Sequence, residues 1–288
     1  MRRAVLTALS ALSVDQGQLH VALAHRDPEA AKRAIRTAEF TTAVERLVVP
    51  ELRATFANAA VHEGKHGRVH LSRVPRETHK ATGRSVSLGY NFNSADPRVA
   101  QWAQQQGAKL VVEITDRTRD AIRGLVATAL REGGHPYALA DQIRPLIGLH
   151  ERYATAVLRY QQRLTDEGIL SSERIAALAS GYYGQLLDSR AETIARTEVL
   201  AAENAGRAET WQQAVDMGLL PPDATKQWVA TGDAEPVCAD LDGTEVALDD
   251  EFDGGDYGSV DMPPLHPNCR CTAVVISPTG VDTGQEIA

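Results

Sequence analysis

The sequence is poor in cysteine, in aromatic residues and in long apolar runs, and each shortage excludes a class of protein. Three cysteines in 288 residues are too few for a disulfide scaffold. They suit a reducing compartment, with thiols that are free or bound to a metal. Aromatic residues make up 5% of a chain that is 43% hydrophobic, which favours helices with small side chains. No window approaches about 18 uninterrupted apolar residues, so we expect no transmembrane helix and a soluble protein of the cytoplasm or of an assembly formed there.

Motifs for nucleotide hydrolysis and for zinc proteases are missing as well. The chain contains no Walker loop, no G-x-G-x-x-G and no H-E-x-x-H, so neither chemistry has support. A thiol protease pair could be written with Cys238 or Cys269 beside His266, but no glycine-shaped oxyanion loop accompanies it. We therefore expect a protein that is not an enzyme. A cysteine- or zinc-dependent hydrolase, or a toxin-like domain using Cys238, His266 and Cys269, is the alternative.

The apolar periodicity predicts a mainly α protein with a small C-terminal α+β lobe. Spacings of three and four residues indicate helices over residues 1–62 and again over 86–217. Within these regions we expect a helix from Pro28 to about Val48, a helix from 97 to about 106 closed by Gly107, and a strand or helix start at 109–114. Between 151 and 217 we expect three successive helices. Strands are predicted at 226–230, 244–248 and 272–276, within an acidic, β-rich lobe over 218–288.

Residues 63–85 interrupt this pattern with a run of positive charge. Glycine and proline break any periodicity there, so we predict a basic, flexible arm. The arm could lie along nucleic acid phosphates, or it could be a solvated linker without specific use, since no aromatic stacking residue falls inside the run. Because the net charge of the chain is −8, the chain as a whole is no obvious binder of polyanions. The candidate contacts for nucleic acid are Lys65, Arg68, Arg73, Arg76, Lys80 and Arg84.

The loop over residues 263–271 holds several potential metal ligands in a backbone that prolines make rigid. Three of the thirteen prolines lie in it and restrict its backbone, and it runs into a β-branched segment. His266, Cys269 and Cys271 in this loop, with Cys238 upstream, offer the four ligands that tetrahedral zinc requires. Three interpretations remain open: a structural zinc site, a loop whose cysteines and histidine only pack and hydrogen-bond, and a disulfide from Cys238 to Cys269 or Cys271.

Separate pieces of the chain together resemble one family. Ala195-Arg196-Thr197-Glu198, Asn204, Trp211, Lys226-Gln227-Trp228, Asp233, Cys238, Leu241-Asp242-Gly243, Phe252 and Pro263-Pro264-x-His266-Pro267-x-Cys269-Arg270-Cys271 occur in order. This order is similar to that of the Mu F-like minor head proteins of tailed bacteriophages, also called phage head morphogenesis proteins. The resemblance is specific over about 185–276 and looser over 86–185. The motif positions expected to be structural are Arg196, Glu198, Asn204, Trp228, Asp233, Asp242, Gly243, Pro264, Pro267 and Arg270.

The resemblance implies a structural role in a phage head. Such proteins are few-copy capsid components that enter the procapsid with the portal and scaffold, and some contact the packaged double-stranded DNA. We therefore expect a virion protein, present in the host cytoplasm during assembly, with portal, capsid or scaffold proteins as partners and no membrane. Many family members carry C-x-x-C before the L-D-G turn, whereas Glu235 occupies the first position here. A family zinc knuckle would need Glu235 or His266 to fill that place, and we predict that the loop is the clasp of a small lobe.

Overall fold

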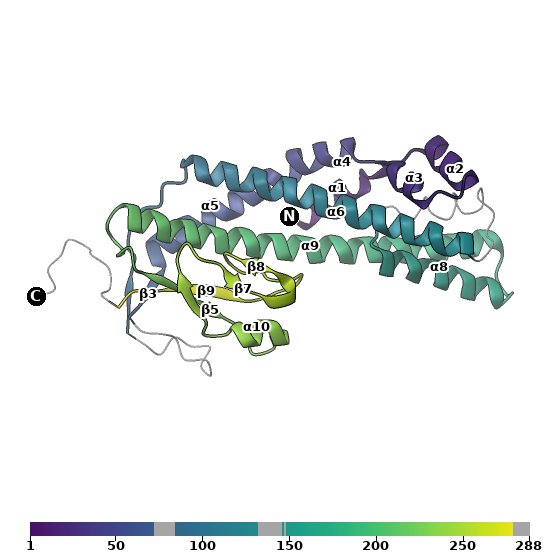
Figure 1. The fold of residues 1–288 in the computed structure, drawn as a ribbon. Coiled ribbons are helices and arrows are strands. Elements are labelled where there is room, and N and C mark those ends of the chain that lie inside the picture. Colours follow the sequence, from purple (N-terminus) through teal and green to yellow (C-terminus); the bar gives the residue numbers. More distant parts are fainter. Residues whose placement is uncertain (72–83, 132–145, 147, 279–288) are drawn as a thin grey trace, which may run out of the picture. The chain divides into compact units, whose positions relative to one another are not determined.

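The computed structural model describes residues 1–71, 84–131, 146 and 148–278. The fold is mainly helical with short strands in the C-terminal region, as the periodicity predicted (Figure 1). The chain divides into two compact units, Met1–Val49 with Gln104–Glu192 and Pro50–Ala103 with Thr193–Ala288. This division does not follow the predicted segments, because two long helices each contribute residues to both units. No helix in the described part of the chain is long and apolar enough to cross a membrane.

The first unit begins with short helices and one small sheet. Asp15 and Asp27 cap two of these helices, accepting hydrogen bonds from the Gln18 N–H at 3.0 Å and the Ala30 N–H at 2.9 Å. The helix that starts at Pro28 ends at Arg33, not near Val48, because the next residues pair with Ser13–Val14 in a two-stranded antiparallel sheet. The elements are α1 (Arg2–Ser10), β1 (Ser13–Val14), α2 (Gln16–Ala24), α3 (Pro28–Arg33), β2 (Ile35–Arg36), α4 (Ala38–Ala43) and the π-helical segment η1 (Val44–Val48).

Helix α6 (Pro97–Arg131) runs unbroken through the positions where a helix end and a strand were considered. The expected stop at Gly107 is wrong: a Cβ there would lie 2.4 Å from Val49 Cγ2, so the glycine serves close packing and not a helix end. The strand considered at 109–114 is wrong too. Leu110 and Ile114, four residues apart, are buried while Val112 between them is exposed, which is a helical pattern.

Between residues 151 and 217 the structure has two helices where three were expected. They are α8 (Glu151–Asp166) and α9 (Ser172–Asp216), and α9 is a single helix of 45 residues. Gly181 and Gly184 lie within it with open space around them, so they interrupt no packing. The third helix expected in this stretch is a continuation of the second, because buried Leu187, Ala191 and Ala195 follow one another at helical spacing.

The second unit contains a five-stranded sheet with the order β4-β3-β9-β5-β6. Pairing is antiparallel except between β3 and β9, which are parallel with Val69 opposite Val275. The predicted strands at 226–230, 244–248 and 272–276 are confirmed within a residue or two. The elements are α5 (Val49–His66), β3 (Arg68–His70), β4 (Ser85–Ser87), β5 (Thr225–Val229), α10 (Pro236–Leu241), β6 (Glu245–Ala247), β7 (Phe252–Asp253), the 3-10 helix η3 (Gly255–Tyr257), β8 (Ser259–Val260) and β9 (Thr272–Ile276).

The predicted flexible arm is corrected at both of its ends. Residues up to His66 complete helix α5, and the next residues form β3 and β4 of the sheet. These short strands carried no readable period, but they pair with each other and β3 pairs with β9. Residues 72–83 of the predicted arm lie outside the described residues.

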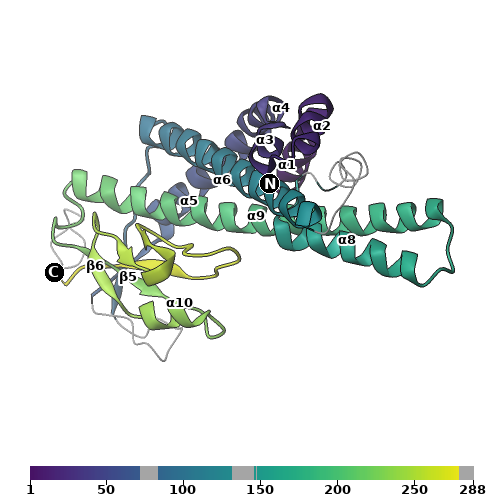
Figure 2. The ribbon, with the colours of Figure 1, turned by 45° about the vertical axis from the view of Figure 1, so that its right-hand side comes forward.

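Two apolar clusters form the core of the second unit. One joins Trp211 on α9 to Val69, Ala273 and Val275 of the sheet, and Figure 2 shows the strands beside the C-terminal part of α9. The other cluster centres on Trp228 and Phe252, whose ring centroids lie 5.1 Å apart at 74°. Cys238, Cys269 and Cys271 belong to this second cluster, so the three predicted thiol ligands lie in one core.

Candidate metal centre

Helix α10 and the loop before β9 bring the candidate ligands together. Pro236 starts α10, and Cys238 in its middle is fully buried against the cluster around Trp228. The loop carrying the other ligands is tied to α9. The Asn268 N–H donates to Thr197 Oγ1 at 3.1 Å, and Asn204 Nδ2 donates to the Cys271 carbonyl at 3.4 Å. These contacts hold the loop on the helix that carries the Arg196 motif.

Three side chains converge on a common point. Cys238 Sγ lies 3.2 Å from His266 Nε2 and 3.9 Å from Cys269 Sγ. One ligand atom from each of these residues lies within 4.8 Å of the other two. Cys271 is buried next to the two thiols but does not belong to this group of three. The structure thus places all four predicted residues at one end of the lobe, three of them within reach of one ion.

The tautomer of His266 suits a ligand. Its Nδ1 atom lies 3.0 Å from the Pro267 carbonyl oxygen. Since a carbonyl oxygen only accepts, this contact places the imidazole proton on Nδ1 and leaves a lone pair on Nε2. That lone pair points at Cys238 Sγ, where it can accept the thiol proton or bind a metal ion.

The distances fit a tetrahedral zinc ion. With Zn–S near 2.3 Å and Zn–N near 2.0 Å, tetrahedral geometry separates two sulfurs by about 3.8 Å and a sulfur from a nitrogen by about 3.5 Å. The observed separations are close to these values: 3.9 Å between the Sγ atoms of Cys238 and Cys269, and 3.2 Å between Cys238 Sγ and His266 Nε2. Two thiols and one imidazole nitrogen are also the donor types that zinc prefers. The residues present therefore fit the ion, with one position left for a fourth ligand.

The three thiols differ in acidity because their surroundings differ. Burial raises the pKa of Cys238 to about 11. Interaction with the Cys271 thiol lowers the pKa of Cys269 to about 5, and its interaction with Cys269, together with burial, raises the pKa of Cys271. Cys269 is thus ready to act as a thiolate ligand, whereas Cys238 would lose its proton on binding a metal ion.

The disulfide alternative does not describe this structure. All three cysteines are free. The 3.9 Å between Cys238 Sγ and Cys269 Sγ is nearly twice the bond length of about 2.05 Å.

The remaining motif residues hold the lobe around this centre. Asn204 and Trp228 are fully buried, and Asn204 Oδ1 accepts a hydrogen bond from Thr272 Oγ1 at 2.7 Å. Asp242 Oδ1 accepts from the Ala230 N–H at 2.9 Å, and Gly243 takes a φ of 75° in the turn that follows. Arg270, which the sequence pairs with no particular partner, forms an exposed ion pair with Asp233. Among the others, Glu198 is buried, Pro264 is half-buried, and Arg196 and Pro267 are exposed.

Sequence reasoning missed two features that support the loop. Thr197 and Thr272, which hydrogen-bond the loop and Asn204, have no distinctive spacing. Lys226, which stood in the quoted Lys226-Gln227-Trp228 motif without a role of its own, is fully buried and forms an ion pair with Asp261 of the acidic run. Thr197 and Lys226 stand inside quoted motifs, and Thr272 and Asp261 lie within three residues of motif positions, which was the available signal.

The candidate nucleic acid contacts fall in three places. Lys65 lies in the last turn of α5, Arg68 lies in β3 with its Nε donating to Ser85 Oγ at 3.1 Å, and Arg84 precedes β4. Arg73, Arg76 and Lys80 lie outside the described residues. No common surface of the six can be built from the described part of the chain.

Comparison with known proteins gives one match. A family model described as "Phage Mu protein F like protein" matches residues 120–274, more than half of the chain. The matched stretch runs from α6 through α8 and α9 into β9 and takes in all four cysteine and histidine positions of the centre. No curated protein and no solved structure matched the chain.

Proposed function

Because the chain belongs to the Phage Mu protein F like family, a family of phage head morphogenesis proteins, we propose that it is a minor structural protein of a phage head. In this proposal it joins the head during assembly in the host cytoplasm and stays in the virion. The observation that carries it is the family match across α9 and the lobe, where the spaced motifs form one connected structure. The resemblance predicted from those motifs is thereby confirmed at the level of the family.

The lobe of the second unit offers the surface that best fits a protein partner. Its carboxylates repel DNA and complement a basic protein surface, and the portal protein is the partner that we propose, with capsid or scaffold proteins as further contacts. Tyr257, 58% exposed among them, provides an aromatic anchor of the kind enriched at interfaces. Among the described residues, the exposed carboxylates of the lobe are Asp223, Asp233, Glu235, Asp240, Asp249, Asp250, Glu251, Asp253, Asp256 and Asp261.

Co-purification of the full chain with the portal protein tests this surface. The variant D249N/D250N/E251Q removes three charges from one exposed loop, and Y257A removes the anchor. We expect each to weaken portal capture at least about tenfold. The control E39Q/E45Q/E167Q removes the same charge from exposed positions of the first unit and should capture the portal normally. Equal capture by all variants would remove the lobe as the docking surface.

We also propose that the basic segment 63–85 contacts packaged DNA. In the described parts of this segment, Lys65, Arg68 and Arg84 supply positive charges near its ends. Contacts of such charges with phosphates release counterions. DNA affinity should then fall steeply between about 50 mM and about 200 mM salt. The K65Q/R68Q/R84Q variant should show a shallower dependence on salt, and an unchanged dependence would count against this contact.

For the cysteine and histidine centre we propose a structural zinc ion that closes the lobe. Burial of Cys238 and Cys269 within the apolar cluster supports a structural role, because a catalytic thiol must meet its substrate. The raised pKa of Cys238 also makes it a poor nucleophile at neutral pH. The competing hypothesis is a hydrolase in which His266 activates Cys238 at 3.2 Å.

Metal analysis and one substitution separate the two hypotheses. The reduced full chain should contain about one zinc per molecule, and C269S should lose zinc together with near-UV circular dichroism from the Trp228 cluster. The hydrolase in which His266 activates Cys238 predicts the opposite: C238S and C269S both fold normally, and C238S has lost activity. Normal folding of C269S without metal would exclude the clasp.

A further inference from the structure

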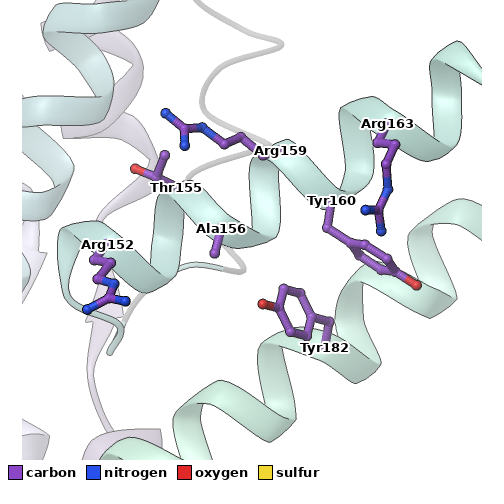
Figure 3. A pocket seen from close by; sticks show the side chains of 7 residues that line it. All are labelled: Arg152, Thr155, Ala156, Arg159, Tyr160, Arg163 and Tyr182. Atoms are coloured by element: carbon purple, nitrogen blue, oxygen red, sulfur yellow. The ribbon is translucent and has the colours of Figure 1, made fainter.

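An open hollow between α8 and α9 in the first unit is lined by three arginines to which the proposed role in a phage head gives no function. Its volume is about 840 Å³ and its wall is formed by Arg152, Thr155, Ala156, Arg159, Tyr160, Arg163 and Tyr182. Figure 3 shows the rings of Tyr160 of α8 and Tyr182 of α9 in the space between the two helices, with Arg163 beside the Tyr160 ring. The two ring centroids are 5.1 Å apart, and the Arg163 guanidinium lies 5.3 Å from the Tyr160 centroid.

The six lining residues of α8 form one continuous stripe. They follow the helical spacing i, i+3, i+4, i+7, i+8 and i+11, while Ala154, Val157 and Leu164 form the buried face. Thr155 and Ala156 are short, so they leave room between Arg152 and Arg159. The row from Arg152 to Arg163 spans about 16 Å along the helix. All three arginines of α8 therefore lie on the side that faces the hollow.

These arginines differ from several other arginines of the unit, which are paired with carboxylates. Within the described residues, none of the three forms an ion pair with a carboxylate, and all three are exposed. By contrast, Arg33, Arg117 and Arg123 of the same unit pair with Asp27, Glu113 and Glu29. A row of guanidinium groups without a carboxylate partner is a surface that an external anion can neutralise.

We propose that this hollow binds the phosphodiester backbone of nucleic acid. Three exposed guanidinium groups spaced along one helix match a linear polymer with a regularly repeated negative charge, and the tyrosine rings beside Arg163 offer faces for a sugar or base. An acidic polypeptide carries the same sign of charge, but among the described residues the hollow presents no large aliphatic side chain to anchor one. The site is distinct from residues 63–85, and only the identification of the bound nucleic acid as a phage genome rests on the proposed function.

Fluorescence anisotropy with the full chain and short labelled DNA tests the site. R152Q/R159Q/R163Q should bind duplex DNA at least about tenfold more weakly than the wild type. If each arginine neutralises one phosphate, the slope of log affinity against log salt should decrease by about 2.7. R33Q/R117Q/R123Q removes the same charge from paired, exposed arginines and should bind within about twofold of the wild type.

Two further arms identify the ligand. If bases stack on the Tyr182 ring, Y182A should weaken the affinity for single-stranded DNA by about fivefold or more, and Y182F should leave it unchanged. If neither variant changes this affinity, the site binds the phosphodiester backbone and no base. Competition by polyglutamate as effective as that by DNA of equal charge would overturn the proposal in favour of an acidic polypeptide. Unchanged binding by the triple arginine variant would overturn it as well.

Separate controls test whether the variants fold and whether the result depends on the proposed phage role. Circular dichroism should show the triple variant folded, and if it is not, R159Q alone should lower the salt slope by about 0.9. The assay needs no head protein, so failure of portal capture would leave this result standing. Loss of binding in K65Q/R68Q/R84Q alone would assign the DNA contact to the other segment and count against the hollow.

Discussion

At the scale of single residues, the second unit depends on a buried charge. The Lys226 side chain is fully buried, whereas its partner Asp261 is 59% exposed. The ammonium group also donates to the Leu248 carbonyl at 3.0 Å and lies 5.7 Å from the centre of the Phe252 ring. Lys226 thus ties β5 to the acidic loops and to the cluster that contains the cysteines.

This arrangement predicts an asymmetry between the two partners. D261A leaves the buried ammonium without its counter-charge and should cost about 1–3 kcal/mol of unfolding free energy. K226M replaces the charge by an apolar chain of similar length and should change stability by less than about 1 kcal/mol. Urea denaturation measures both, and a K226M variant less stable than D261A would contradict the asymmetry.

His70 makes the stability of the second unit depend on pH. Burial, and then the charge of Arg68, hold the pKa of His70 below its usual 6.5. The unfolded chain therefore binds the proton more readily than the folded chain, so the stability linked to His70 is present above pH 6.5 and is lost as the pH falls through the folded pKa. H70Q should show a smaller loss of unfolding free energy than the wild type between about pH 7 and pH 5. His150, whose pKa is also lowered by burial, titrates in both proteins, so parallel curves would refute the role of His70 only.

At the scale of elements, α9 contains glycines with opposite environments. A Cβ on Gly206 would lie 2.5 Å from the Phe56 carbonyl oxygen and 3.1 Å from the Ala60 nitrogen of α5, whereas nothing lies within 4 Å of one on Gly184. G206A should therefore destabilise the protein by about 1–3 kcal/mol through overpacking. G184A should stabilise it by about 1 kcal/mol through helix propensity. Thermal unfolding of the two variants compares them, and a neutral G206A would show that α5 and α9 can separate without cost.

The extent to which the sequence predicted these elements follows the range of their contacts. The strand ending at Ile276 carries a β-branched run, the strand ending at Val229 lies between the prolines at 221–222 and Gly232, and the closing loop is marked by its prolines, so local patterns found them. Strand β3 pairs with β9, which lies about 200 residues later in the chain, and no local pattern encodes such a partner. At 109–114 the β-branched residues favoured a strand, but burial of Leu110 and Ile114 on one helical face prevailed.

The candidate site also has features that local patterns predicted and features that depend on contacts between distant parts of the chain. Cysteine and histidine types predicted the centre, because few residue types bind zinc. Which three converge could not be predicted, since it depends on α10 meeting the loop before β9. The arginine row on α8 was present as a helical spacing, but its significance depends on the missing carboxylate partners and on Tyr182 from another helix.

At the scale of the whole molecule, the proposed zinc ion should stabilise only one of the two units. Cys238, His266 and Cys269 all belong to the second unit, and the apolar cluster they join contains no residue of the first. Binding a metal ion contributes to stability where its ligands are ordered. Removal of zinc with a chelator should therefore raise amide hydrogen exchange in α10, in β5 and in the loop before β9.

Hydrogen exchange measured by mass spectrometry, with and without chelator, resolves the two units. Peptides from α1, α2 and α8 should keep their protection, because Cys238, His266 and Cys269 all belong to the other unit. The variant H266N, which lacks the imidazole nitrogen, should show the same loosening without chelator. Equal loss of protection in both units would mean that they unfold as one, and the ion would then stabilise the whole chain and not only the lobe.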